Sequence, residues 1–284
     1  MIDFLWLPIS YGFMQRGLAA AVIVGALCAL IGCYVVLRSM AFMGDAMAHA
    51  ILPGIAIAYL LGGNLLLGAL IAAIAVALGI GFFSQGGAIK EDTAIGILFS
   101  AALSLGVALI SSIRTYAVDL SHILFGNVLG VSPANLVLIG SLAAAVVLTV
   151  VIFYRPFLVV TFDPVLAKTL RMPTGLLRNL MLILLSVTIV ISLQTVGIGL
   201  VAAMLVTPAA AAYMLTRRLP VMMVAAALIG AISGVIGLYL SYYVSVASGA
   251  AIVLVCTAFF LLALFFAPTR GIAWRFARNH REVR

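Results

Sequence analysis

Charge is scarce in this chain of 284 residues. Only 8% of the residues are charged, whereas 66% are hydrophobic. A soluble domain usually carries about 25% charged residues, so this composition excludes an ordinary water-facing surface and makes the lipid bilayer the solvent. The length therefore sets a number of membrane spans, and we expect residues 1–284 to form a single transmembrane domain.

Several catalytic motifs are also missing. The chain has two lysines, Lys90 and Lys168, and neither follows a GxxxxG sequence, which excludes ATP hydrolysis through a P-loop. No HExxH or GxSxG motif is present, so an intramembrane enzyme is the least favoured class. The three cysteines form no CxxC pair and lie in apolar segments, where we expect small core residues at Cys28, Cys33 and Cys256.

Nine apolar runs are long enough to cross a bilayer. A span needs about 20 helical residues, because each covers about 1.5 Å of a hydrocarbon layer about 30 Å thick. Only QTVG separates the sixth run from the seventh, so eight spans is the alternative. The fold class is therefore all-α and polytopic, with predicted spans at roughly 17–37, 42–61, 65–83, 93–113, 135–154, 177–194, 197–215, 221–241 and 249–267.

The basic residues predict the orientation of these spans. If the N-terminus lies outside, 13 Lys and Arg residues fall on the inside, and only Arg16 and Arg114 fall outside. This asymmetry follows the positive-inside rule, so we predict an N-out, C-in arrangement. It also explains the net charge of +8 without a nucleic-acid partner, because the charge lies in short connections and in a basic tail at 268–284 that suits the anionic inner face. The outside connection at 114–134 is expected to hold a re-entrant or interfacial helix.

The stretch GDAMAHAILPG, residues 44–54, places costly polar groups in the second predicted span. Asp45 and His49 are four residues apart and share one face of a helix. An aspartate at the centre of a transmembrane helix costs about 2.5–3.5 kcal/mol on insertion scales, and such residues mark functional pathways. Pro53 has no N–H, so the carbonyl of His49 loses its helical donor, and Gly54 follows this break. Mixed oxygen and nitrogen ligands suit Mn, Fe or Zn.

Two other interpretations of the Asp45–His49 pair stay open at this point. The two side chains could satisfy each other and only hold helices together. They could also relay protons, because histidine titrates near neutral pH.

A second polar patch, KEDTAIG at 90–96, opens the fourth predicted span. Glu91 and Asp92 could simply satisfy the free N–H groups and the positive dipole end of a helix. Alternatively, one of them approaches Asp45 from the inner side, where both spans begin, and contacts the same metal ion.

Two further segments are rich in proline and small residues. Pro208 lies among alanines within the predicted span 197–215, where it produces a kink or tight packing, or bends the helix beside a pathway. The sequence GAISGVIG at 230–237 contains a GxxxG pattern, which we expect to serve ordinary close packing of helices.

The inside connection TFDPVLAKTLRMPTG predicts a short amphipathic helix. Asp163 is suited to the N-cap and Pro164 to the first helical position, whereas Met172-Pro173 ends the helix. The helix is too short to span and is expected to lie across the inner face. It either docks into another protein or is a plain surface helix, and its apolar residues are Val165, Leu166, Ala167 and Leu170.

Five segments in order carry a resemblance to a known family. From about residue 12 to residue 267, the chain resembles the permease subunits of bacterial ABC importers for zinc, manganese or iron. The segments are VLRSMAFMGDAMAHAILPGIAIAYLLG, EDTAIGILFSAALSLGV, LFGNVLGVSP, FDPVLAKTL and VGIGLVAAMLVTPAAAAYMLT.

The resemblance implies a non-catalytic, multi-pass subunit of the bacterial cytoplasmic (inner) membrane. Its implied partners are a second copy of itself, ATP-binding subunits inside and a metal-binding receptor outside. The metal ion is then cargo, and no permanently bound cofactor is implied.

Asp45 and His49 match the family's positions for metal contact, and Glu91 and Asp92 match its acidic pair. The helix from Asp163 matches the coupling helix that touches the ATPase. One departure is Arg171, where the family usually has glycine, so the docking surface can differ here.

Two rival functions remain. A permease for larger metal chelates shares this architecture but needs a wide pathway without a ligand pair. A self-sufficient secondary transporter or channel would need no ATPase. The ligand types alone do not choose among Zn, Mn and Fe, because first-row metals share them.

Overall fold

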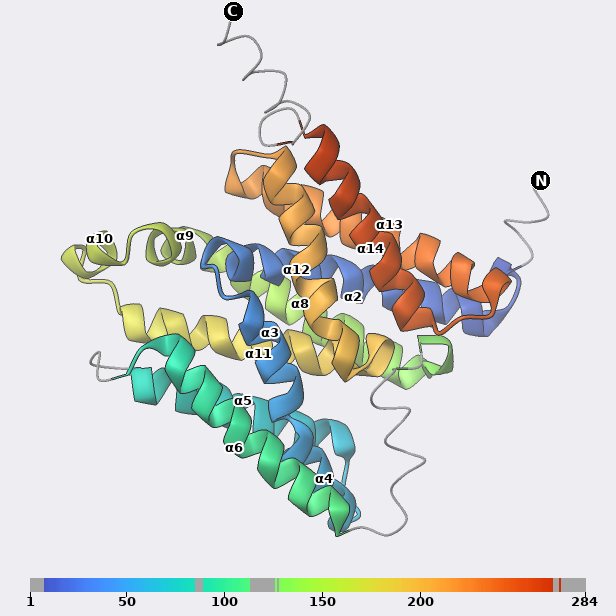
Figure 1. The fold of residues 1–284 in the computed structure, drawn as a ribbon, viewed down its shortest axis with the longest axis horizontal. Coiled ribbons are helices and arrows are strands. Elements are labelled where there is room, and N and C mark those ends of the chain that lie inside the picture. Colours follow the sequence, from blue (N-terminus) through green and yellow to red (C-terminus); the bar gives the residue numbers. More distant parts are fainter. Residues whose placement is uncertain (1–7, 85–88, 113–125, 127, 268–270, 272–284) are drawn as a thin grey trace, which may run out of the picture.

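The computed structural model describes residues 8–84, 89–112, 126, 128–267 and 271. These residues form helices throughout (Figure 1), which confirms the predicted all-α class. The basic tail at 268–284 lies outside the described part of the chain, Gly271 apart, as does most of the connection at 114–134. The long helices are α2 (Gly12–Leu37), α3 (Ala41–Ala50), α4 (Leu52–Leu60), α5 (Leu65–Ser84), α6 (Glu91–Ser111), α8 (Pro133–Ile152), α9 (Tyr154–Phe162), α11 (Thr174–Val196), α12 (Ile198–Leu215), α13 (Leu219–Val244) and α14 (Ser248–Phe266).

Two short elements complete the described structure. The connection predicted to be re-entrant contributes the 3-10 turn η2 (Val128–Gly130), and the predicted amphipathic helix is α10 (Pro164–Thr169). Within the described ranges, eight helical segments are long and apolar enough to cross a membrane, and α3 and α4 together form one of them. The remaining apolar helix is α12, which Gly197 separates from α11 at a positive φ of 84°. The weak boundary in the sequence is thus a real helix break.

Helix α2 lies in the middle of the bundle and packs against α8, α11, α12 and α13 (Figure 1). Its glycines allow the backbones to approach closely. A Cβ at Gly25 would collide with the backbone of Gly230, and a Cβ at Gly32 would collide with the carbonyl of Leu205. Gly230 belongs to the GxxxG pattern, so close packing between α2 and α13 confirms the expected role of that pattern. All three cysteines are buried and free, as predicted for core residues.

The predicted inside connections gather at one end of the bundle. The last turn of α2, the first turns of α6 and α11, and the helices α9 and α10 lie together at the left of Figure 1. Arg38, Lys90, Arg155, Lys168 and Arg178 are all at this end. The grouping agrees with an alternating series of spans. Which side of the membrane this end faces stays a prediction from the positive-inside rule.

Candidate metal site

Helix α3 presents one open stripe on an otherwise buried surface. It begins after a tight turn in which Ser39 has a positive φ of 57°. Phe42, Asp45 and His49 are exposed or half-buried, whereas most of the other residues of α3 are buried. The spacing of three and four residues puts all three side chains on one helical face. The two predicted metal ligands therefore point to the same space, as their spacing predicts.

The Asp45 and His49 side chains lie close together but do not hydrogen-bond. The His49 Nε2 atom is 3.7 Å from the Asp45 Oδ1 atom, and the two side chains are 28% and 41% exposed, respectively. A hydrogen bond between these atoms would be about 2.7–3.2 Å long. The two side chains therefore do not satisfy each other through a hydrogen bond, and both keep lone pairs for a third partner. This geometry disfavours the interpretation in which the two side chains only satisfy each other.

An aromatic residue that the sequence analysis missed borders this site. The Phe99 ring, on α6, lies 6.2 Å from the His49 ring and 6.1 Å from the Phe42 ring, measured between centroids. Helix α6 packs directly against α3. No local pattern marks Phe99, because its role depends on which helices become neighbours.

Pro53 divides the second span into two helices. Helix α3 ends at Ala50 and α4 begins at Leu52, with Pro53 in its first turn, where no N–H is needed. The N–H of Ile51 is directed to the carbonyl oxygen of His49. This contact joins residues only two positions apart, whereas a helical hydrogen bond joins residues four positions apart, so a His49 carbonyl without a helical donor stays a prediction. The Asp45 and His49 side chains stay the predicted ligands of this site.

Close packing accounts for Gly54. A Cβ at Gly54 would collide with the carbonyl oxygen of Gly68 on α5, and a Cβ at Gly106 on α6 would lie 2.7 Å from the Leu52 Cβ atom. The break at Pro53 thus lets α4 lie tightly between α5 and α6. We find a packing role for Gly54, and a pathway role stays a prediction.

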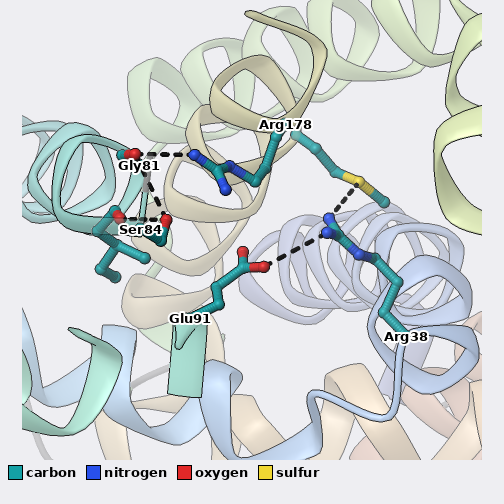
Figure 2. Close-up of polar contacts among 7 residues, drawn as sticks. Arg38, Gly81, Ser84, Glu91 and Arg178 are labelled. Carbon is teal, nitrogen blue, oxygen red and sulfur yellow. Dashed lines mark hydrogen bonds and ion pairs between the residues drawn. The ribbon is translucent and has the colours of Figure 1, made fainter. Parts of the chain in front are cut away.

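The acidic pair at the start of α6 splits into two different environments. Figure 2 shows the Glu91 side chain extending toward Arg38, and the Glu91 Oε2 atom is 3.5 Å from the Arg38 Nη2 atom. Asp92 is exposed. Within the described structure, the ion pair of Glu91 is with Arg38 and not with a residue of α3. Lys90 is the N-cap of α6 and makes no side-chain cap there. Metal contact by Glu91 or Asp92 therefore stays a prediction.

Helix α12 supports the back of the metal site. A Cβ added at Gly44 of α3 would meet the Leu205 Cδ1 atom at 3.3 Å and the Ala202 Cα atom at 3.7 Å. Pro208 is buried inside α12, and the helix continues through it to Leu215. Because Gly44 precedes Asp45, α12 presses on the face of α3 beside the ligands. A pathway role for Pro208 stays a prediction.

Helix α10 confirms the predicted cap and corrects the predicted end. The Leu166 N–H donates to the Asp163 Oδ1 atom at 2.8 Å, and Pro164 opens the helix. The helix ends at Thr169, before Met172-Pro173 is reached. Leu166 and Leu170 are exposed, but Ala167 is fully buried against its own chain. Ala167 therefore anchors α10 to its own chain, and Val165, Leu166 and Leu170 are the apolar residues left on its outer face.

The end of α10 explains why glycine is expected where this chain has Arg171. Arg171 has a φ of 54°, its N–H donates to the carbonyl of Lys168, and the Met172 N–H donates to the carbonyl of Ala167. This hydrogen-bond pattern is a Schellman motif, in which the left-handed position favours glycine. In this left-handed conformation, a residue with a Cβ atom is less stable than glycine by about 1 kcal/mol.

We therefore expect Arg171→Gly to stabilise the end of α10 by about 1 kcal/mol. Hydrogen exchange of the Met172 amide should become about fivefold slower, because 1.4 kcal/mol corresponds to a factor of ten. Arg171→Ala is the matched control, since it removes the charge but keeps the Cβ atom. Equal exchange rates in the two variants would contradict the backbone explanation.

One chain alone supplies only part of a coordination sphere. Among the described residues, no group of three or more His, Cys, Asp or Glu side chains is placed to hold a metal ion. Asp45 and His49 give one oxygen and one nitrogen ligand group. A cation with four to six ligands needs further donors from water, from a second chain or from another molecule.

Comparisons with known proteins agree with this architecture. The ABC 3 transport family matches residues 10–267. The manganese transport system membrane protein MntC of Halalkalibacterium halodurans is 50% identical over 273 residues, which cover 96% of this chain and 94% of the relative. The chelated iron transport system membrane protein YfeD of Yersinia pestis is 40% identical over 265 residues, covering 93% and 89%.

A solved structure is also similar over its whole length. PsaBC from Streptococcus pneumoniae in complex with Fab superposes with a TM-score of 0.86 at 37% identity, covering 99% of this chain and 100% of that one. The bundle of membrane helices is thus an architecture that this chain shares with a solved structure to which it is 37% identical. Because the family match extends over nearly all of the described helices, this chain belongs to the ABC 3 transport family.

Proposed function

We propose that this chain is the membrane-spanning permease of an ATP-driven importer for divalent manganese or iron in the bacterial inner membrane. The observation that carries the proposal is the Asp45–His49 pair, which is held open on one stripe of α3. Relatives that are 50% and 40% identical are named as manganese and chelated iron transport proteins. Zinc is the third candidate, because the same ligand types bind it.

A second copy of the chain would complete the coordination sphere. Two copies related by a two-fold axis present the same patch to each other, so an open stripe near the axis would bring two carboxylates and two imidazoles together. Four such ligands suit a divalent first-row metal ion. The half-exposed state of Asp45 and His49 in the single chain supports this homodimer.

The proposed partners follow from what the chain does not supply itself. The sequence lacks a P-loop, so the energy would come from a separate ATP-binding subunit that docks on α10 at the inner end of the bundle. A metal-binding receptor would deliver the ion at the opposite end. A permease for larger metal chelates is less supported. The Phe99 ring borders the site, and the Asp45 carboxylate and His49 imidazole would coordinate a bare ion directly.

A reconstitution experiment tests this proposal against the secondary-transporter rival. We expect the chain to copurify from its native membrane with an ATP-binding subunit, and proteoliposomes holding both to take up radioactive Mn²⁺ only when ATP reaches the ATP-binding subunit. Proteoliposomes with this chain alone, under an imposed proton gradient, are the control. Uptake by the chain alone at the same rate would show that it works without an ATPase.

A further inference from the structure

A partly buried ion pair joins the C-terminal end of α2 to the N-terminal end of α6, the helix that packs against α3 beside the metal site. Arg38 is at the end of α2, and Glu91 opens α6. Their closest atoms are 3.5 Å apart, and their side chains are only 18% and 21% exposed (Figure 2). Neither residue is explained by the transport mechanism described above.

Each member of this pair depends on the other. The Glu91 Oε1 atom is buried and has no hydrogen-bond partner among the described residues. The Nη1 atom of Arg38 contacts only a weak acceptor, the Met181 Sδ atom, at 3.6 Å. Removing one partner from a buried pair leaves an uncompensated charge and is strongly destabilising, and this cost is smaller where the pair is partly exposed. We therefore expect the loss of either charge to destabilise this region.

Arg178, another arginine at this end of the bundle, binds a backbone carbonyl and not Glu91. The Arg178 Nη2 atom donates to the carbonyl of Gly81 at 2.8 Å (Figure 2), which fastens α11 to the last turn of α5. Gly81 is also approached by the Asn179 side chain. Glu91 is thus the acidic group that joins the α2 end to α6.

The position of the pair connects it to the metal site. Arg38 precedes the first residue of α3 by only three residues, and Glu91 lies on the same helix as Phe99. Phe99 contacts the rings of both Phe42 and His49. A shift of α6 away from the α2–α3 turn would therefore withdraw the Phe99 ring from the ligand His49.

We propose that the Arg38–Glu91 ion pair positions the metal site, by holding α6 against α3 so that Phe99 supports His49. Glu91 is then a positioning residue that acts through Arg38, and it does not ligate the transported ion. This inference rests on the proposed function, because it assigns a role within the same Asp45–His49 site.

A charge swap separates positioning from metal ligation. We expect Glu91→Arg alone and Arg38→Glu alone each to weaken Mn²⁺ binding to the folded dimer by at least about tenfold, as supporting residues of metal sites typically do. The double variant Arg38→Glu/Glu91→Arg restores an ion pair, so its affinity should return to within about threefold of the original. If Glu91 were a ligand, the double variant would bind as weakly as Glu91→Arg, because arginine has no lone pair to donate.

The binding measurement uses the Mn²⁺ electron paramagnetic resonance signal of the purified permease with its ATP-binding subunit, referred to the fraction of folded protein. Glu91→Gln, which keeps the shape of the side chain, is measured beside the swaps, together with the melting temperature of each variant. Arg155→Glu is the matched control, since Arg155 is exposed at the same end of the bundle and the charge change equals that of Arg38→Glu.

The outcomes are distinct. A lowered melting temperature with unchanged affinity per folded molecule would show a purely structural pair and overturn the positioning role. Weak binding in the double variant, with strong binding in Arg155→Glu, would also overturn it and favour ligation by Glu91. Absence of Mn²⁺ binding to the original complex would instead count against the proposed metal function itself.

Discussion

Asp45→Asn is expected to reduce ATP-dependent Mn²⁺ uptake by at least about 100-fold, because it removes the only carboxylate on the open stripe of α3. The amide keeps the size of the side chain but loses the negative charge that offsets a divalent cation. Supporting residues around metal sites already contribute 10–100-fold, so a direct ligand should contribute more. In a dimer the change removes two carboxylates at once. His49→Ala should have an effect of the same order, because it removes the nitrogen ligands.

Assembly with the ATP-binding subunit shows whether the loss of Mn²⁺ uptake is specific to the metal site. Asp45 is 41% exposed and is not part of the buried core, so we expect the Asp45→Asn permease to copurify with its ATP-binding subunit in normal yield. Ser141→Ala is the matched control, since Ser141 is exposed on α8 and its hydroxyl donates to the carbonyl of Leu138 in its own helix. Normal uptake by Asp45→Asn would exclude Asp45 as a metal ligand and remove the main support for the proposed pathway.

Local patterns predicted most of the fold. Apolar runs of about 20 residues correspond to the spanning helices, and the four-residue spacing of Asp45 and His49 places them on one face. Asp163 caps α10 as its sequence predicts, because capping depends only on residues three positions apart. These features could be predicted since helix geometry fixes which nearby residues share a face.

Contacts between distant helices could not be predicted in this way. Nothing near Glu91 in the sequence indicates Arg38, which is 53 residues away, and nothing near His49 indicates Phe99. The burial of Ala167 likewise depends on how α10 packs against α9 and α11.

The second prediction of large effect concerns the coupling of α10 to ATP hydrolysis. Leu166→Glu should abolish Mn²⁺ uptake while leaving Mn²⁺ binding to the dimer unchanged. Leu166 and Leu170 are exposed apolar side chains on a helix capped firmly by Asp163, and Val165 is 74% exposed beside them. An apolar patch on so short a helix suits a groove on another protein. A carboxylate buried in such a groove without a partner costs several kcal/mol, enough to prevent docking.

Two variants of α10 distinguish docking from local unfolding. Lys168→Glu places a carboxylate at an exposed position of α10 that lies away from Leu166 and Leu170 around the helix, so it should retain most of the uptake if docking depends on these two leucines. Ala167→Glu would place the charge on the buried side of α10 and should detach the helix from its own chain, which lowers the protection of its amides from exchange. Leu166→Glu should preserve that protection and lose only the ATP-binding subunit on purification. If Leu166→Glu copurifies with the ATPase and transports normally, α10 is a plain surface helix, and the permease must receive the energy of ATP hydrolysis through another part of its inner end.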